Sequence, residues 1–319
     1  MAHEITMTDS LFTARFPAWH GLGRIVDEAP TSEEALRVAG LDWEVTSTPI
    51  YTMQETFQGY KPSQVEDWVA NVRSDTGETL GIVGKGYKVV QNKEAFAFTD
   101  LLLGEGVRYE SAGSLRAGRR VWLLAKMPET KILGDKVEPY LVFSNGHDGN
   151  AAVKVAMTPV RVVCMNTLNI ALSGASRFWS TSHQGDIAKK LEDAQRTLEL
   201  ATKYMDALDE ASQRLADIQI TKDLLADITT QLFPLPKDQK RHSLVYEMRK
   251  EFMFRYEAAP DLARFRGTGW GVVNAASDFA GHRTPKRVGP THQENKFSQI
   301  IGGHPVIDRA VDLVLATVA

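Results

Sequence analysis

Apolar and polar residues alternate along four short stretches in the middle of the chain, and this pattern predicts β-strands. The stretches are Val107 to Ala112, Arg119 to Lys126, Pro139 to Asn145 and Ala151 to Cys164. Short β-branched runs separated by Gly, Asn and Asp are typical of antiparallel hairpins. The sequence therefore predicts an antiparallel meander over 107–164, with an edge or a bulge at Pro159 and a helix at 165–172.

The residues before this meander predict a mixture of helices and strands. Thr31 and Glu34 have the spacing of a capping box and begin a short helix that ends at Gly40. Strands are predicted at 43–53, 68–74 and 79–83, the last two forming a hairpin around 75–78. A further helix is predicted over 92–103.

After residue 182 the apolar spacing changes from two to three and four residues, which predicts helices. A long amphipathic helix covers 184–232 with a break near Ile220, and further helices cover 238–256, the segment through Phe279, and 305–318. The predicted fold class is α+β, an antiparallel meander with flanking helices followed by a mainly helical half. Residues 1–180 and 181–319 form the two predicted regions, and it stays open whether they share one core.

Charge is distributed unevenly along the chain, although the net charge is only −3. Residues 1–110 carry a net charge of −8, and residues 111–319 carry +5. Segregation of this kind is expected for a protein with one basic face. No apolar run is long enough for a membrane span, and one cysteine, Cys164, excludes an internal disulfide. These features predict a cytoplasmic protein with no membrane partner.

Motifs for common catalytic chemistry are missing from the sequence. The glycine-rich segment 84–88 lacks the spacing of a phosphate-binding loop, and no dinucleotide, zinc-protease or serine-hydrolase signature occurs. His147 and Asp148 offer an acid–base pair or two metal ligands, but the segment 145–150 is also a strong turn sequence. The turn interpretation is favoured, so no catalytic residue, metal ligand or cofactor is predicted.

Basic and aromatic residues interleave in the meander and just after it. Lys and Arg side chains neutralise phosphates, and aromatic rings stack on unpaired bases. The predicted nucleic-acid-binding residues are Arg116, Arg119, Arg120, Trp122, Lys154, Arg161, Arg177 and Trp179.

Four strings resemble a family found on phages and plasmids and known as domain of unknown function 932. They are 19–23 (WHGLG), 145–149 (NGHDG), 158–168 (TPVRVVCMNTL) and 267–282 (GTGWGVVNAASDFAGH), and the similarity extends from about residue 15 to 315. The resemblance implies a place near replication and recombination genes, with no settled activity. A meander that leads into long helices is also similar, at the level of fold, to phage single-strand annealing proteins of the RecT and Red-beta kind.

The sequence thus predicts a protein that binds single-stranded DNA and promotes annealing in phage or plasmid recombination or replication, as a homo-oligomer. Two alternatives stay open. One is a metal-dependent nuclease that uses His147 and Asp148. The other is an accessory factor that binds a host defence protein through the acidic N-terminal part.

Overall fold

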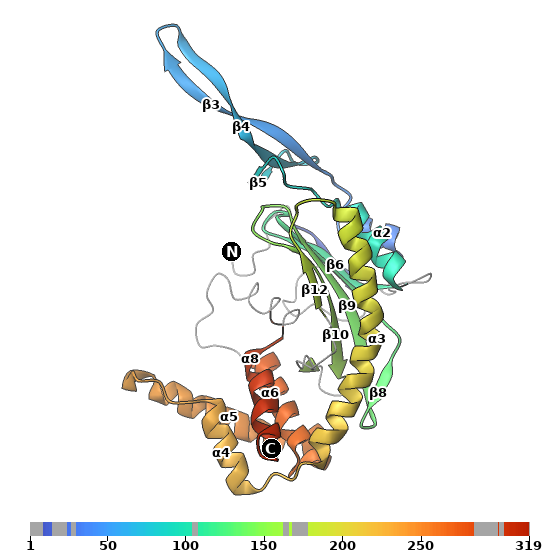
Figure 1. Ribbon diagram of the computed structural model, residues 1–319, viewed down its shortest axis with the longest axis vertical. Helices are drawn as coiled ribbons and strands as arrows, with labels where there is room; N and C mark the ends of the chain where they lie inside the picture. The colour runs from blue at the N-terminus through green and yellow to red at the C-terminus, as the bar shows by residue number, and fades with distance from the viewer. Residues whose placement is uncertain are drawn as a thin grey trace.

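The protein is elongated, with a sheet-containing body, a β-arm at one end and helices at the other (Figure 1). The structure is a computed structural model, and it describes residues 9–14, 24–26, 30–103, 108–161, 166–167, 178–283, 299 and 303–318. Strands dominate the N-terminal half and helices the C-terminal half, so the predicted α+β class is confirmed.

The body is built on the predicted meander. Its strands are β6 (Tyr109–Leu115), β7 (Arg120–Lys126), β9 (Asp135–Gly146) and β10 (Val153–Arg161), each antiparallel to the next. The sheet is extended at one side by β1 (Leu11–Ala14) and β2 (Arg24–Val26). At the other side it is extended by β11 (Asn166–Thr167) and β12 (Phe178–Thr181), while β8 (Thr130–Ile132) pairs with β9.

The prediction for the segment that follows the meander is wrong. A helix was expected over 165–172, but Asn166 and Thr167 form β11, whose backbone pairs with Val160 and Arg161. Extension of the β10 ladder competes with helix formation here, and the remaining residues of the predicted helix lie outside the described part of the chain.

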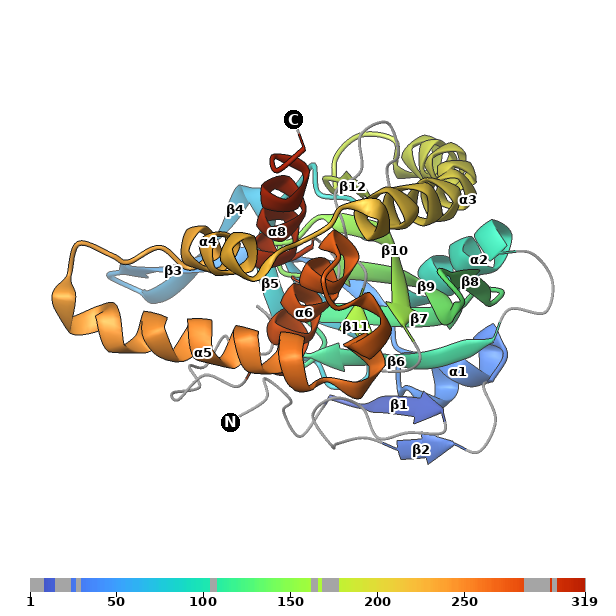
Figure 2. The ribbon, with the colours of Figure 1, turned by 90° about the horizontal axis from the view of Figure 1, so that it is seen from below.

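Helices α1 (Ser32–Val38), α2 (Asn92–Leu103) and α3 (Ile187–Asp217) lie along one face of the sheet (Figures 1 and 2). Alternate residues of β7 point to opposite faces, and Val121, Leu123 and Ala125 are fully buried in the core that α1 and α2 cover. At the start of α1, the predicted capping carboxylate of Glu34 accepts a hydrogen bond from the backbone N–H of Thr31 at 3.1 Å.

The C-terminal half contains α4 (Lys222–Leu232), η1 (Gln239–Arg241), α5 (His242–Ala258), η2 (Pro260–Phe265), α6 (Gly269–His282) and α8 (Pro305–Leu315). The predicted break after the long helix lies between α3 and α4. Helix α6 is central, and a Cβ on Gly271 would lie 2.2 Å from the carbonyl oxygen of Phe265, so a larger residue does not fit there. Sheet residues Ile132, Val137 and Met157 belong to the same apolar core as these helices.

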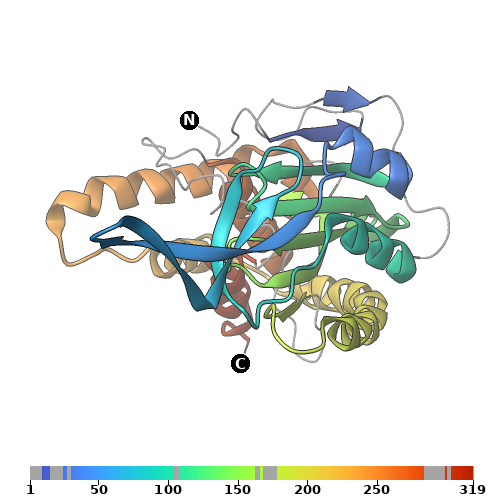
Figure 3. The ribbon, with the colours of Figure 1, turned by 90° about the horizontal axis from the view of Figure 1, so that it is seen from above.

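The most unexpected element is a long hairpin of β3 (Val45–Thr56) and β4 (Gly59–Arg73), which β5 (Thr79–Gly84) joins near its base. We call the projecting part, residues 45–68, the arm (Figures 1 and 3). The sequence predicted its two base strands as separate runs, whereas the structure continues them into one hairpin that turns at 57–58. Among the described residues, no helix is long and apolar enough to cross a membrane.

Candidate functional site

The arm meets the body at a junction of three segments, which we call the joint. These are the chain leaving β5 (85–92), the β6–β7 turn (116–119) and the β9–β10 loop (147–152). Backbones approach closely here, because a Cβ on Gly81 of β5 would lie 2.5 Å from the Cα of Asp148. The joint therefore needs a glycine at this position.

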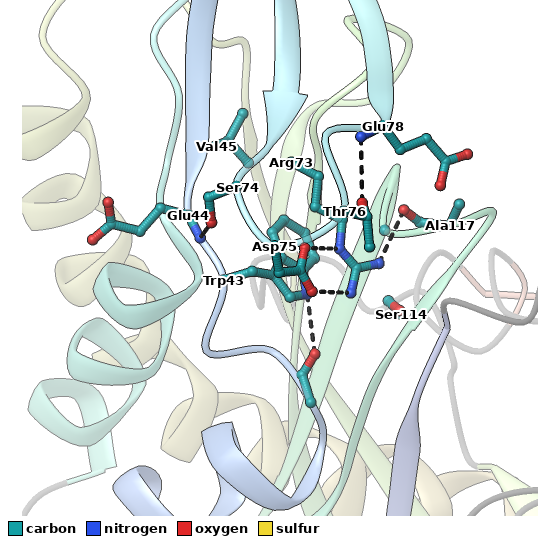
Figure 4. Close-up of polar contacts among 12 residues, drawn as sticks. Trp43, Glu44, Val45, Arg73, Ser74, Asp75, Thr76, Glu78, Ser114 and Ala117 are labelled. Atoms are coloured by element: carbon teal, nitrogen blue, oxygen red, sulfur yellow. Dashed lines mark hydrogen bonds and ion pairs between the residues drawn. The ribbon is translucent and has the colours of Figure 1, made fainter.

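Arg73, at the end of β4, fixes the arm to the β6–β7 turn (Figure 4). Its side chain is buried, and Nε and Nη2 donate to the two carboxylate oxygens of Asp75 at 2.8 and 3.0 Å. Nη1 donates to the carbonyl of Ala117 at 3.2 Å, and the guanidinium lies 4.5 Å from the ring centroid of Trp43. Such a planar, five-donor group is suited to joining several segments at once.

The segment 85–92 is held by side chains that reach it from the end of β9 and from beyond β12. His183 Nδ1 lies 2.8 Å from the carbonyl oxygen of Lys88, and Asn145 Nδ2 donates to the carbonyl of Val90 at 2.9 Å. In the reverse direction, the Tyr87 hydroxyl donates to the carbonyl of Gly146 at 2.6 Å. The ring of Tyr87 stacks on that of His183, with centroids 4.4 Å apart.

His147, the first residue of the β9–β10 loop, is wholly buried within the joint. The amide nitrogen of Asn92 donates to the carbonyls of Leu41 and Trp43, so its Oδ1 is left to accept from His147 Nε2 at 3.2 Å. This arrangement places the proton on Nε2 of a neutral ring. Burial, together with a smaller effect of the nearby His183, lowers the pKa of His147 to about 3. Burial also lowers the pKa of His183.

A cleft of about 510 Å³ opens between the base of the arm and the β9–β10 loop. Its size is within the usual range of small-ligand sites, roughly 300–1,000 Å³. One wall carries Trp68 and Ile82, whose side chains are 49% and 59% exposed. The other carries Asp148, Asn150 and His183. The cleft thus combines an accessible aromatic ring with hydrogen-bonding groups.

A comparison with protein families finds one match, described as Domain of unknown function (DUF932), over residues 79–301. The chain belongs to the DUF932 family. The matched range begins at β5, so it includes the cleft's second wall but not strands β3 and β4 of the arm. No curated protein and no solved structure matches the chain, so the analogy to annealing proteins of the RecT kind has no structural support.

Three of the predicted DNA-binding residues of this DUF932 protein lie at the joint. Arg116, Arg119 and Arg120 form or flank the β6–β7 turn, and the carbonyl of Arg119 accepts a hydrogen bond from the His147 backbone at 2.9 Å. Arg119 is exposed, while Arg120 is half-buried and lies close enough to His183 and Tyr87 to affect their pKa values.

The other predicted residues are dispersed. Trp122 is 5% exposed and packs with Leu11 and Leu115, so its ring is not available for base stacking. Lys154 is half-buried. Lys154 and Trp122 are both paired with Ser144, from strands on either side of it, so their side chains lie on the same face of the sheet. Trp179 lies on the opposite face, half-buried against the core. The backbone of Arg161 pairs with that of Val137 in β9, but its side chain lies outside the described part of the structure. Arg177 lies outside the described residues.

Sequence reasoning missed the exposed aromatic residues of the arm and of the cleft wall. They are Tyr51, Phe57, Tyr60 and Trp68. Alternation along a strand shows that one face is apolar, but it does not show whether anything covers that face. The sequence offered one signal for this exposure. No helix-forming segment occurs between 45 and 84, so little in this region could cover the apolar face.

The nuclease alternative requires His147 and Asp148 to belong to a metal site. Among the described residues, no group of three or more His, Cys, Asp or Glu side chains could hold a metal ion. The Asp148 carboxylate instead accepts from the backbone and the side-chain amide of Asn150, at 3.0 and 3.3 Å. Asn145 and Gly146 end β9, and residues 147–150 lie in the connection between β9 and β10, in accordance with the turn interpretation.

Proposed function

We propose that this DUF932 protein binds single-stranded DNA at the joint and promotes annealing during phage or plasmid recombination or replication. The observation that carries the proposal is the exposed ring of Trp68 on the wall of the cleft. Stacking of a base on an aromatic side chain contributes about 1–3 kcal/mol and tolerates any sequence. A base must be unpaired to enter such a cleft, which favours single strands over duplex.

Cations on the segments that flank the cleft support the proposal. Arg119, Lys85 and Lys88 are exposed, and Arg120 is half-buried. Acidic residues partly offset this charge, since Lys85 pairs with Glu66 at 3.4 Å and Asp148 lines the cleft. We therefore expect a short phosphate path along Arg119 and Lys88 rather than a broad basic groove.

No covalent chemistry is needed for the proposed activity. Phosphate contacts would hold the strand, and stacking would keep one base unpaired and separated from its neighbours. A strand held in this extended state loses less conformational entropy when a complementary strand pairs with it. The rigid joint suits this role, because Arg73 and the bonds to segment 85–92 fix both walls of the cleft.

The electrostatic part of the proposal is tested by Arg119→Ala, measured by fluorescence anisotropy with a labelled single-stranded oligonucleotide over a salt series. Loss of one phosphate contact should reduce the slope of log K against log salt by roughly 0.7. Lys131→Ala is the matched control, since Lys131 is also exposed but lies on β8. Equal slopes for Arg119→Ala and the wild type would exclude this residue from the DNA path.

A second candidate function, binding of a host protein, is favoured by the exposed aromatic residues of the arm. Phe57, Tyr60 and Tyr51 lie in the acidic N-terminal part of the chain. A wild-type protein that binds no single-stranded DNA at low salt, but retains a specific protein partner through the arm, would favour this candidate over DNA binding.

A further inference from the structure

The distal arm has an apolar face. Tyr51 pairs with Gln64, Met53 with Pro62 and Glu55 with Tyr60, and directly paired residues point to the same side of a hairpin. Tyr51, Met53 and Tyr60 are 54%, 60% and 69% exposed, and Phe57 at the tip is fully exposed. Contiguous apolar surfaces of this kind mark interaction sites in folded proteins.

Nothing in the described part of the chain covers this face. Beyond Pro49, strand β3 pairs with β4 alone, and β5 pairs with β4 only over Trp68–Val72. A two-stranded hairpin is marginally stable in water unless a further element packs on it. A partner for the arm would therefore supply stability as well as affinity.

The helical half of the molecule carries a second projection with complementary properties. We call residues 233–250, at the end of the α4–α5 helix pair, the prong (Figures 1 and 2). Leu235, Leu244 and Tyr246 are exposed there. The side chain of Arg249 braces the prong by donating through Nη2 to the carbonyls of Phe233 and Thr230, at 2.8 and 3.3 Å.

The two projections have opposite charge. The arm contains Lys61 against Glu55, Glu66 and Asp67, a net charge of −2. The prong contains five Lys and Arg residues against two acidic ones, a net charge of +3. Exposed apolar residues within complementary fields are the usual composition of a specific protein interface.

We infer that the arm of one copy docks on the prong of a second copy of this chain. Figure 1 shows the arm at one end of the long axis and the prong projecting sideways from the helical half, so the contact joins unlike surfaces. Figures 2 and 3 show both projecting toward the same side of the body. One arm–prong contact joins two copies, and a second such contact either closes the pair as a twofold dimer or leads on to a ring or a filament.

Light scattering after size exclusion, without nucleic acid, tests the inference with three variants. The arm variant is Phe57→Asp with Tyr60→Asp, and the prong variant is Arg241→Glu with Tyr246→Asp. Leu101→Asp is the control, because Leu101 is a 74% exposed apolar residue on α2. The wild type and the control should form a dimer of the 35.4 kDa chain or a larger species, and each double variant should be a monomer.

Mixing the arm variant with the prong variant gives the decisive result. Each supplies the surface that the other lacks, so an equimolar mixture should form a dimer of twice 35.4 kDa and nothing larger. A prong variant that still dimerises by itself would overturn the inference, since arms would then pair with each other. A monomeric wild type would also overturn the inference. So would an arm variant that has the same oligomer mass as the wild type but no longer binds DNA. Thermal unfolding confirms that each variant is folded.

Discussion

At the scale of the residue, the joint depends on a few buried polar side chains that replace apolar packing. Arg73 links the arm to the β6–β7 turn, and His147 and Asn145 each reach the segment leaving β5. Removing one partner from such a network leaves the other buried without a hydrogen bond, which costs about 1–3 kcal/mol. The joint is therefore expected to be specific in geometry and sensitive to substitution.

Acid should weaken the joint through His147. Its pKa is near 6.5 in the unfolded chain and about 3 in the folded protein, so the unfolded state binds more protons below pH 6.5. The stability that neutral His147 supplies is thus complete above pH 6.5 and is lost as the pH falls. Between about pH 7.5 and pH 5 the free energy of unfolding should fall by about 2 kcal/mol from this residue.

Denaturant titrations of the wild type and of His147→Gln across this pH range measure the effect. The amide of Gln can replace the Nε2–H donor but does not titrate, so its stability should decline less steeply with acid. His183 also has a lowered pKa, and its contribution to the pH dependence of stability is present in both proteins. Parallel curves for the two proteins would contradict the assignment of the acid effect to His147.

Two glycines of β5 allow a matched test of the close backbone approach at the joint. Gly81→Ala would place a Cβ 2.5 Å from Asp148 Cα, whereas at Gly84 the nearest atom would be the carbonyl oxygen of Asp67 at 3.9 Å. We expect Gly81→Ala to lower the free energy of unfolding by about 1–3 kcal/mol, because backbone must move to relieve the overlap. Gly84→Ala should be nearly neutral in the same denaturant titration. Equal effects of the two substitutions would show that the backbones at Gly81 and Asp148 have room for an added methyl group.

At the scale of the element, the sequence predicted most helices and strands but not how they are exposed. The Pro234–Pro236 pair and the Thr31–Glu34 box mark the ends of helices through local chemistry. Such signals do not depend on tertiary structure. The length of the arm could not be predicted, because its turn at Phe57–Gln58 has none of the favoured hairpin dipeptides. The burial of Trp122 and His147 depends on contacts between distant segments, so local patterns did not show it.

Hydrogen exchange should divide the arm into two parts. Amides of the base, Val69–Val72, lie in a strand between β3 and β5 and should exchange slowly. Amides of the tip, Met53–Lys61, belong to an exposed two-stranded ribbon and should exchange far faster in a monomeric variant. Uniform slow exchange along the arm of a monomer would contradict its description as an unsupported projection.

At the scale of the whole molecule, the cleft lies between the base of the arm and the body, and the arm and the prong project from different halves of the chain. The sequence showed uneven charge and the proximity of Arg116, Arg119 and Arg120 along the chain, from which we predicted a DNA-binding role. It did not locate the cleft, because Trp68, Asp148 and His183 come from three separate parts of the chain. The proposed DNA path and the proposed assembly use different surfaces, so each can be tested without the other.

Single-strand binding by Trp68→Ala tests the central proposal most directly. Fluorescence anisotropy with a labelled single-stranded oligonucleotide should show binding weakened by about 1–3 kcal/mol, or roughly 5- to 150-fold, with an unchanged salt slope. Leu101→Ala, an exposed apolar residue away from the cleft, should bind as the wild type does. Wild-type protein that binds single-stranded DNA no more tightly than duplex at low salt, or a folded Trp68→Ala variant with unchanged affinity, would contradict the account.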